Sequence, residues 1–170
     1  MYFFILYLIL NTQYLILKYM IIITNKRAYF DYQILETFEA GIELFGFEVK
    51  AIKNGRINIA GSYVVIRDNE AYLLNADIPA YQPKNAPENY DSKRTRRLLL
   101  KKSEIKTLIG RTQEKGLTLL PLKVYTKGRK NLIKIEIGLG KSRKKADKRE
   151  VLKKREVGRE IRREIRRSAE

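Results

Sequence analysis

The sequence predicts a mainly β protein with some helix: a small closed antiparallel β-barrel with two to three helices, followed by a basic C-terminal tail. The chain has 170 residues, of which 44% are hydrophobic, which suits one folded domain with appendages. Its central part contains five or six short β-type segments bounded by Gly, Asn, Asp and Pro. Because short antiparallel strands bury a core best when the sheet has no free edge, we expect the strands to close.

The first 24 residues form an apolar extension that we exclude from the fold. Residues 1–10 are an unbroken apolar run, apolar residues resume at 14–23, and Lys18 is the one charged side chain. The stretch has about the length of a membrane span, ~20 residues, but it lacks the basic start and the cleavage site of a signal peptide. Two interpretations stay open: a membrane segment, or a mis-assigned start with translation beginning at Met20. We favour the second.

The body, residues 25–140, is expected to begin with strands. Residues 25–32 are polar and basic and are interpreted as a lead-in. Residues 32–44 alternate between apolar and polar side chains, which predicts one or two strand segments. Residues 48–54 have apolar positions at helical spacing, and Gly55 is expected to end this two-turn helix.

A hairpin and a long loop are expected next. Residues 62–67 and 70–78 are rich in β-forming residues and are separated by Asp68 and Asn69, a dipeptide typical of tight turns. Residues 79–92 contain three of the four prolines, which predicts an irregular loop. Loops of this length are usually functional or mobile.

The C-terminal part of the body is expected to contain a helix and two strands. Ser103 is expected to cap a helix that Gly110 interrupts or redirects, and Gly116 is expected to end its continuation. Residues 117–126 and 132–137 are expected to form two strands, the second with one buried and one solvated face. Together, these elements favour a closed barrel of the oligonucleotide-binding type.

The charge distribution indicates an anionic partner. The chain carries 36 Lys and Arg against 19 Asp and Glu, a formal charge of +17. Residues 141–170 hold 14 basic and 6 acidic residues, and residues 20–140 hold 21 and 13, so both parts have a net charge of +8. A moderately basic body with a densely basic arm is typical of an RNA or DNA binder. A merely solubilising surface is the alternative.

The composition excludes several chemistries. The chain has no Cys and no His. Zinc, iron–sulfur and haem sites that need thiolate or imidazole ligands are therefore excluded, as are nucleophile systems that need Cys or His. We expect no enzyme, no metal, no cofactor and no small-molecule substrate. The missing cysteines fit a reducing compartment, and we expect a cytoplasmic protein.

Two clusters combine basic and aromatic side chains as RNA contacts would. Residues 93–97, with Tyr81 and Tyr90 nearby, are one candidate for phosphate binding and base stacking. The second candidate consists of Asn25, Lys26, Arg27, Tyr29 and Tyr32. In both cases a charged rim without RNA is an equal alternative. Glu39 and Glu48 are interpreted as structural acids that position Arg and Lys side chains, and residues 98–100 as core.

The tail, residues 141–170, is predicted to be disordered alone and helical on RNA. Its first residues are nearly continuous positive charge, which opposes order. Val157, Ile161 and Ile165 recur every four residues, which predicts one apolar stripe on a helix. Glu–Arg pairs three residues apart add only a few tenths of a kcal/mol each, so the isolated helix is marginal. When the tail lies along RNA phosphates, the release of counterions would offset the entropy cost of ordering it into a helix.

Several separated blocks occur in a specific order and spacing. They are Asn25-Lys26-Arg27-Ala28, Asp31-Tyr32, Phe38-Glu39-Ala40-Gly41-Ile42, Gly46-x-Glu48-Val49-Lys50, Ser62-Tyr63-Val64, Arg94-Thr95-Arg96-Arg97-Leu98-Leu99-Leu100, Lys115-Gly116-Leu117-Thr118, Pro121-Leu122 and Asp147-Lys148-Arg149. In this arrangement the chain resembles the SsrA-binding protein (small protein B) family over about residues 25–149. It departs from the family pattern at Tyr90-Asp91-Ser92, where the family has His-Asp-Pro. It also departs at Ser142, where the family has Gly, and at Ala146, where the family has an aromatic residue or His.

The resemblance implies a non-enzymatic RNA-binding adaptor of trans-translation. Its barrel would bind the tRNA-like part of transfer-messenger RNA and, with elongation factor Tu attached to that RNA, bring it to stalled ribosomes for rescue. The tail would enter the empty mRNA channel near the decoding centre of the small subunit. We expect a monomer. The alternative function is a structural ribosomal or nucleoid protein that binds duplexes without preference.

The resemblance also implies specific residues. Asn25, Tyr32, Glu39, Leu99 and Lys134 match positions tied to binding the RNA, with Leu99 acting through packing. With the neighbouring blocks, the expected RNA-binding residues are Asn25, Lys26, Arg27, Tyr32, Glu39, Glu48, Lys50, Arg94, Arg96, Arg97, Leu99 and Lys134. The expected ribosome-contacting tail residues are Lys144, Lys145, Asp147, Lys148, Arg149, Lys153, Lys154, Arg155 and Ile161.

Overall fold

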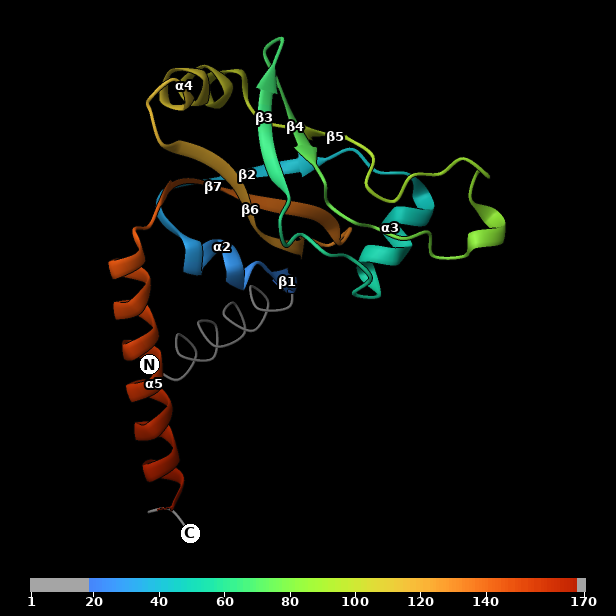
Figure 1. Cartoon of the computed structure of the whole chain (residues 1–170). Helices are drawn as coiled ribbons and strands as arrows, with labels where there is room; N and C mark the ends of the chain where they lie inside the picture. Colours follow the sequence, from blue (N-terminus) through green and yellow to red (C-terminus); the bar gives the residue numbers. More distant parts are fainter. Residues whose placement is uncertain (1–18, 168–170) are drawn as a thin grey trace, which may run out of the picture.

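The computed structural model describes residues 19–167 and consists of antiparallel strands with short helices between them (Figure 1). The strands are β1 Tyr19–Thr24, β2 Tyr32–Ile42, β3 Tyr63–Arg67, β4 Glu70–Leu74, β5 Arg96–Leu99, β6 Leu117–Lys127 and β7 Leu132–Ser142. The helices are α2 Lys26–Asp31, α3 Gly46–Lys53, α4 Lys102–Thr112 and α5 Lys145–Arg167, with a 3-10 turn η1 at Pro83–Asn85.

Six of the strands close into a ring. The order is β1-β6-β3-β4-β5-β2-β7, and β7 also pairs with β6 along almost its whole length. β1 extends the part of the β6 edge that β3 leaves open. Bulges at residues 34–36 of β2 and at residues 121–123 of β6 bend the longest strands, and Pro121 lies at the second bulge. The closed, mainly β architecture confirms the fold class expected from the sequence.

The core lies inside the ring and continues under two helices. β7 supplies Ile133, Ile135 and Ile137 on alternate positions, as its sequence predicts. Ile52 from α3 and Leu108 from α4 are fully buried against the same cluster. α4 lies at one end of the ring and α3 near the other (Figure 1). At about 25 cal/mol per Å² of buried apolar area, this cluster is the main stabilising term of the fold.

Local sequence signals were correct for α3 and for the β3–β4 hairpin. Gly55, which follows the C-cap residue Asn54 of α3, has φ of +74°, the conformation that favours glycine at a helix end. Asp68 and Asn69 both have positive φ, 51° and 60°, as a tight hairpin turn requires. β4 ends earlier than expected, at Leu74, because Asn75 also adopts positive φ and redirects the chain.

Two segments near the N-terminus differ from expectation. The predicted lead-in, residues 25–32, contains helix α2, which Asn25 caps by accepting a hydrogen bond from the Ala28 backbone NH at 3.0 Å. β1 lies within the apolar stretch that was expected to lie outside the fold, yet it pairs with β6 from Tyr19 to Thr24. Excluding these six residues from the fold was therefore wrong. Residues 1–18 lie outside the described part of the chain.

Helix α4 also differs in detail. It begins one residue before Ser103, and the carboxylate of Glu104 accepts the backbone NH of Lys101 at 2.8 Å, so Ser103 is not its cap. The helix continues through Gly110 to Thr112 rather than breaking there. Gly116 lies after the helix with φ of +84°, as expected for a residue that ends it.

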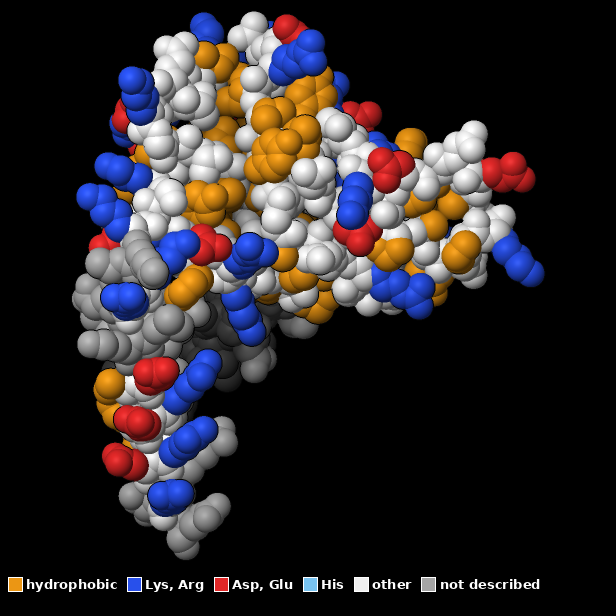
Figure 2. Space-filling view, in the orientation of Figure 1, with side chains coloured by type: hydrophobic (Ala, Val, Ile, Leu, Met, Phe, Trp, Pro, Cys, Tyr) orange, Lys and Arg blue, Asp and Glu red, His pale blue; other side chains and the backbone are white. Residues whose placement is uncertain are grey.

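The basic tail forms helix α5, which extends away from the body beside α2 (Figure 1). Figure 2 shows acidic side chains in a row along this helix with basic side chains beside them. The apolar stripe lies on the surface, with Val157, Ile161 and Ile165 all at least half exposed. The dependence of this helix on RNA stays a prediction. Among residues 19–167, no helix combines the length and apolar character needed to cross a bilayer.

Candidate nucleic-acid interface

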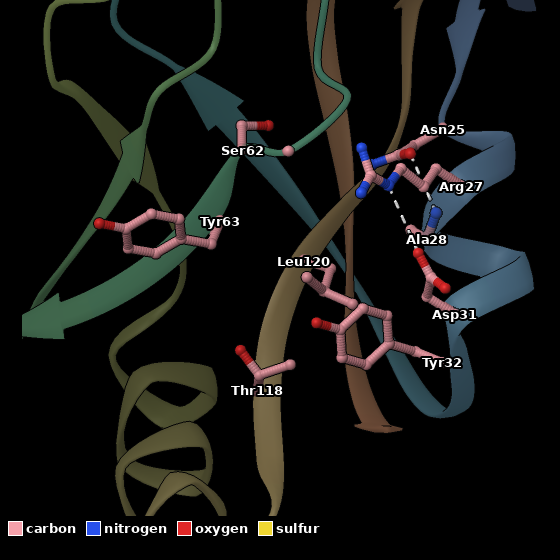
Figure 3. A pocket seen from close by; sticks show the side chains of 10 residues that line it. Asn25, Arg27, Ala28, Asp31, Tyr32, Ser62, Tyr63, Thr118 and Leu120 are labelled. Carbon is pink, nitrogen blue, oxygen red and sulfur yellow. Dashed lines mark hydrogen bonds and ion pairs between the residues drawn. The ribbon is translucent and has the colours of Figure 1, made fainter. Parts of the chain in front are cut away.

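A pocket of about 420 Å³ lies between α2 and the barrel (Figure 3). Arg27 and Asp31 line it from α2, and Tyr32 lines it from the start of β2. The opposite wall is formed by Ser62 and Tyr63 at the start of β3. The pocket therefore combines a cation with two aromatic rings, which are the groups that hold phosphates and stack on bases.

Asn25 borders this pocket but uses its amide within the protein. Its Nδ2 donates to the carbonyl oxygens of Ile59 at 3.1 Å and Pro121 at 2.9 Å, and its Oδ1 accepts from the Ala28 NH. The residue is 5% exposed. Its side chain therefore fixes α2 to the barrel, and the structure assigns it a supporting position in the predicted site.

Arg27 is the exposed cation of the pocket. Its side chain is 75% exposed, and Nε donates to Asp31 Oδ2 at 3.4 Å, across one turn of α2. Lys26 is also exposed on α2. Both side chains can reach an anion without unfolding any element, and their contact with RNA stays a prediction.

Glu39 lies on the outer surface of the ring in a cluster of charged and phenolic groups. Its carboxylate accepts hydrogen bonds from Tyr125 Oη at 2.6 Å and from Lys127 Nζ at 2.8 Å. These two bonds, the one from Lys127 first, lower the pKa of Glu39. On the neighbouring strand Glu136 pairs with Lys123 at 2.9 Å. The interpretation of Glu39 as an acid that positions cations agrees with these contacts.

Leu99 and Lys134 line a second pocket, of about 440 Å³, at the end of the ring near α3. Leu99 is 53% exposed, whereas Leu98 points into the core. The prediction that residues 98–100 are all core was therefore wrong for Leu99, because strand alternation turns it outward. Lys53 and Lys130 also line this pocket, so its apolar wall has lysines around it.

Glu48 and Arg96, both among the expected RNA-binding residues, are fully buried, so neither side chain is exposed at the surface. The Glu48 carboxylate accepts from Arg96 Nε at 3.0 Å, from Arg94 Nη2 at 2.6 Å and from the Phe45 NH at 2.8 Å. Burial alone would raise the pKa of Glu48, but the hydrogen bond from Arg94, the bond from Phe45 and the charge of Arg96 together lower it.

The same network extends into the long loop. Arg96 Nη1 donates to the Ala76 carbonyl at 2.7 Å, and Nη2 donates to the Ser92 carbonyl at 2.8 Å. The Tyr90 hydroxyl lies 2.6 Å from the Ile78 carbonyl and 2.9 Å from Glu48 Oε1. These contacts tie α3, residues 79–92 and β5 together, so this part of the predicted site is structural.

The predicted clamp of residues 93–97 is not assembled as one surface. Arg96 is inside, Arg97 pairs with Glu70 at 2.7 Å, and the Arg94 guanidinium lies 4.1 Å from the centre of the Phe45 ring. Tyr81 instead contacts Arg56, whose Nη1 donates to its carbonyl at 3.4 Å. Lys50 is exposed on α3.

The structure describes the side chains of some of the predicted tail residues but not of others. The backbone NH of Lys144 donates to Asp147 Oδ2 at 3.1 Å, Lys148 pairs with Asp31, and Arg149 and Ile161 are exposed. The side chains of Lys145, Lys153, Lys154 and Arg155 lie outside the described part of the structure. Within the described residues, no group of three carboxylates is placed to hold a metal ion.

Comparison with known proteins identifies the family. A family model described as SmpB protein matches residues 22–167. The chain belongs to the SmpB family. The match begins inside β1, so the second half of this strand is part of the family domain. The resemblance inferred from the sequence blocks is confirmed.

Relatives and a solved structure agree with this assignment. The chain is 52% identical over 141 residues to the SsrA-binding protein of Thermosipho africanus, covering 83% of this chain and 93% of that protein. It is 48% identical over 144 residues to the SsrA-binding protein of Microcystis aeruginosa, covering 85% and 92%. A chain solved in work described as "tmRNA-SmpB: a journey to the center of the bacterial ribosome" is similar with a TM-score of 0.60 and 43% identity, over 72% of this chain and 85% of that one.

Proposed function

We propose that this chain is an RNA-binding adaptor of trans-translation that binds the tRNA-like part of transfer-messenger RNA and brings it to stalled ribosomes. The observation that carries the proposal is the family match together with a solved neighbour described by both the RNA and the ribosome. The family consists of RNA-binding proteins rather than enzymes, which agrees with the expectation from the sequence.

The body would recognise folded RNA by shape. Proteins bind structured RNA mainly through phosphates and 2′-hydroxyls, with unpaired bases stacking on aromatic rings. The pocket between α2 and β3 offers Arg27 to a phosphate and Tyr32 and Tyr63 to a base. The cluster around Glu39 and the lysines beside Leu99 extend the contact surface over other parts of the ring.

The tail would occupy the mRNA channel near the decoding centre when no message fills it. α5 has 23 residues, which at 1.5 Å per residue gives a helix about 35 Å long. Its exposed cations, among them Arg159, Arg163 and Arg167, favour a groove lined by phosphates. We propose that such a groove stabilises the helix, since i,i+3 ion pairs alone add little.

The remaining parts of the proposal follow from this role. Elongation factor Tu would bind the RNA rather than this chain. The protein would act as a monomer, because the ring closes within one chain, and it would work in the cytoplasm, where its ribosomes are.

The experiment is to purify the tagged full chain from cells and sequence the RNA bound to it. Enrichment of one long, tRNA-like RNA over bulk tRNA supports the proposal. Equal recovery of tRNA, ribosomal RNA and duplex DNA in competition would instead support a structural ribosomal or nucleoid protein.

A matched pair of variants tests the pocket. Arg27→Ala removes a cation from it, whereas Arg67→Ala removes a similarly exposed cation that pairs with Asp68 at the hairpin tip. Loss of one phosphate contact is expected to weaken binding about tenfold at low salt in Arg27→Ala. Equal affinities of the two variants would remove the pocket from the proposed interface.

A further inference from the structure

Three hydrogen bonds connect the start of the tail to Asp31 and Tyr32, which line the pocket. The Arg143 backbone NH donates to the Asp31 carbonyl at 2.9 Å, and Arg143 Nε donates to the Tyr32 carbonyl at 3.2 Å. Lys148 Nζ donates to Asp31 Oδ1 at 2.7 Å. The first two bonds fix the chain before α5, and only the third reaches the helix itself.

The Asp31 carboxylate is shared between the pocket and the tail. Oδ1 accepts from Lys148 and Oδ2 accepts from Arg27, so one side chain contacts a cation of each part. Asp31 and Lys148 side chains are 24% and 32% exposed, which limits solvent screening of their attraction compared with a fully exposed pair. The bond from Lys148 is the main reason why the pKa of Asp31 is lowered. The Lys148 ammonium also lies 6.0 Å from the centre of the Phe30 ring.

The first turn of α5 separates two tasks between adjacent residues. Asp147 accepts the backbone NH of Lys144 and so satisfies a donor at the helix start. Lys148 points to α2 and pairs with Asp31. The acid therefore accepts a hydrogen bond at the start of the helix, and the cation next to it connects the helix to α2.

A contact at this position has a large effect at the far end of the tail. A helix about 35 Å long that turns by 20° about its first residues moves its tip by about 12 Å. One ion pair in the first turn can therefore decide where residues near 160 lie relative to the body.

We propose that Asp31 is a positioning residue that holds Lys148, and through it helix α5, in a fixed direction from the RNA-binding pocket. The use of this direction, to place the tail while the pocket holds RNA, rests on the proposed function. The contact itself belongs to the free protein and is measured without RNA.

The chain contains no cysteine, so spin labels can be attached to cysteines introduced at exposed positions. Lys106→Cys on α4 and Arg159→Cys on α5 report the distance from body to tail in the full chain. Pulsed electron paramagnetic resonance is expected to give one narrow distance distribution. Asp31→Asn and Lys148→Gln are each expected to broaden it roughly twofold, because the ion pair is lost.

Three further variants separate this contact from a general structural effect. Lys148→Arg keeps the charge and is expected to retain the narrow distribution. Arg27→Gln removes the other partner of Asp31 and is also expected to retain it. The double variant Asp31→Asn with Lys148→Gln is expected to be no broader than either single variant, because both remove the same link.

The proposal is overturned if Asp31→Asn leaves the distribution narrow, or if the double variant is broader by the sum of the two single effects. Circular dichroism of each variant verifies that the fold persists. Because no RNA is present, a negative result in this distance measurement does not contradict the proposed function. A negative result in the RNA capture experiment does not contradict the positioning contact.

Discussion

Glu48 shows how a single buried residue supports the proposed RNA-binding surface from within the fold. Its carboxylate offsets the charge of Arg96, which has no exposed surface, and anchors Arg94 at the surface. Removing one partner of a buried pair leaves an uncompensated charge in a medium of low polarity. Residues of this kind affect binding through the fold.

Glu48→Gln is therefore expected to destabilise the protein by about 3 kcal/mol. Thermal unfolding measures this, with Arg67→Ala as the control because its ion pair with Asp68 is exposed. The control is expected to change the free energy of unfolding by less than about 0.5 kcal/mol. An equal loss in both variants would contradict the assigned role of the network.

The same residue gives a pH dependence. The pKa of Glu48 is lowered from 4.5 in the folded protein, so its contribution is complete above the unfolded value and is lost as the pH falls through the lowered one. Unfolding measured below pH 5 is expected to show a steeper acid loss in the unsubstituted protein than in Glu48→Gln. If the stability of the two proteins fell in parallel with decreasing pH, the lowered pKa of Glu48 would be contradicted.

At Glu39 the prediction concerns RNA affinity. Lys127→Met leaves the carboxylate without its main cation and close to incoming phosphates, so affinity is expected to fall about tenfold. Adding Glu39→Gln is expected to restore part of it, because the repulsive charge is removed. Filter binding at constant salt compares the single and double variants, and a double variant weaker than Lys127→Met would contradict this reasoning.

At the scale of elements, Gly138 in β7 shows how closely the strands pack. A Cβ on Gly138 would lie 2.6 Å from Leu122 Cδ1, whereas one on Gly110 in α4 would meet no atom within 4 Å. Gly138→Ala is expected to cost about 1–3 kcal/mol by overpacking. Gly110→Ala is expected to stabilise α4 by up to about 1 kcal/mol. Denaturant unfolding measures the free energy of unfolding of both variants. A loss of stability in Gly110→Ala as well would contradict the expected stabilisation of α4.

Elements with a local signal could be predicted, and those that depend on distant partners could not. The alternation in β7, the turn at Asp68 and Asn69 and the end of α3 at Gly55 are all visible in short stretches of sequence. α2 has only six residues and depends on the bonds from Asn25 to Ile59 and Pro121, which no local pattern reveals.

The same dependence on distant partners explains why the burial of Arg96 in the candidate site was not predicted. An arginine is normally expected at the surface, and the partner that allows Arg96 to be buried is 48 residues away in the chain. The available signal was alternation: in β5, Arg96 and Leu98 point inward and Arg97 and Leu99 outward. Recognising residues 96–99 as a strand would have predicted both the buried arginine and the exposed leucine.

At the scale of the whole molecule, the charge distribution predicts a steep salt dependence. Six phosphate contacts correspond to a loss of about 10³ in affinity between 50 and 200 mM salt. Truncation after Lys144 removes the tail helix and leaves β7, which ends at Ser142, intact. If the tail contacts RNA only on the ribosome, the truncated protein is expected to keep the slope for isolated RNA and to lose rescue of stalled translation. A flat salt profile would contradict an interface built on phosphates.

The side chain of Asn25 joins three backbone groups from α2, β6 and the segment before β3. With alanine at this position α2 could move, and Arg27 and Asp31 would move with the helix. Weak RNA binding by such a variant would therefore be accompanied by a lower melting temperature and a misdirected tail. A mutational map of the interface that omitted these two measurements would record a displaced helix as a missing contact.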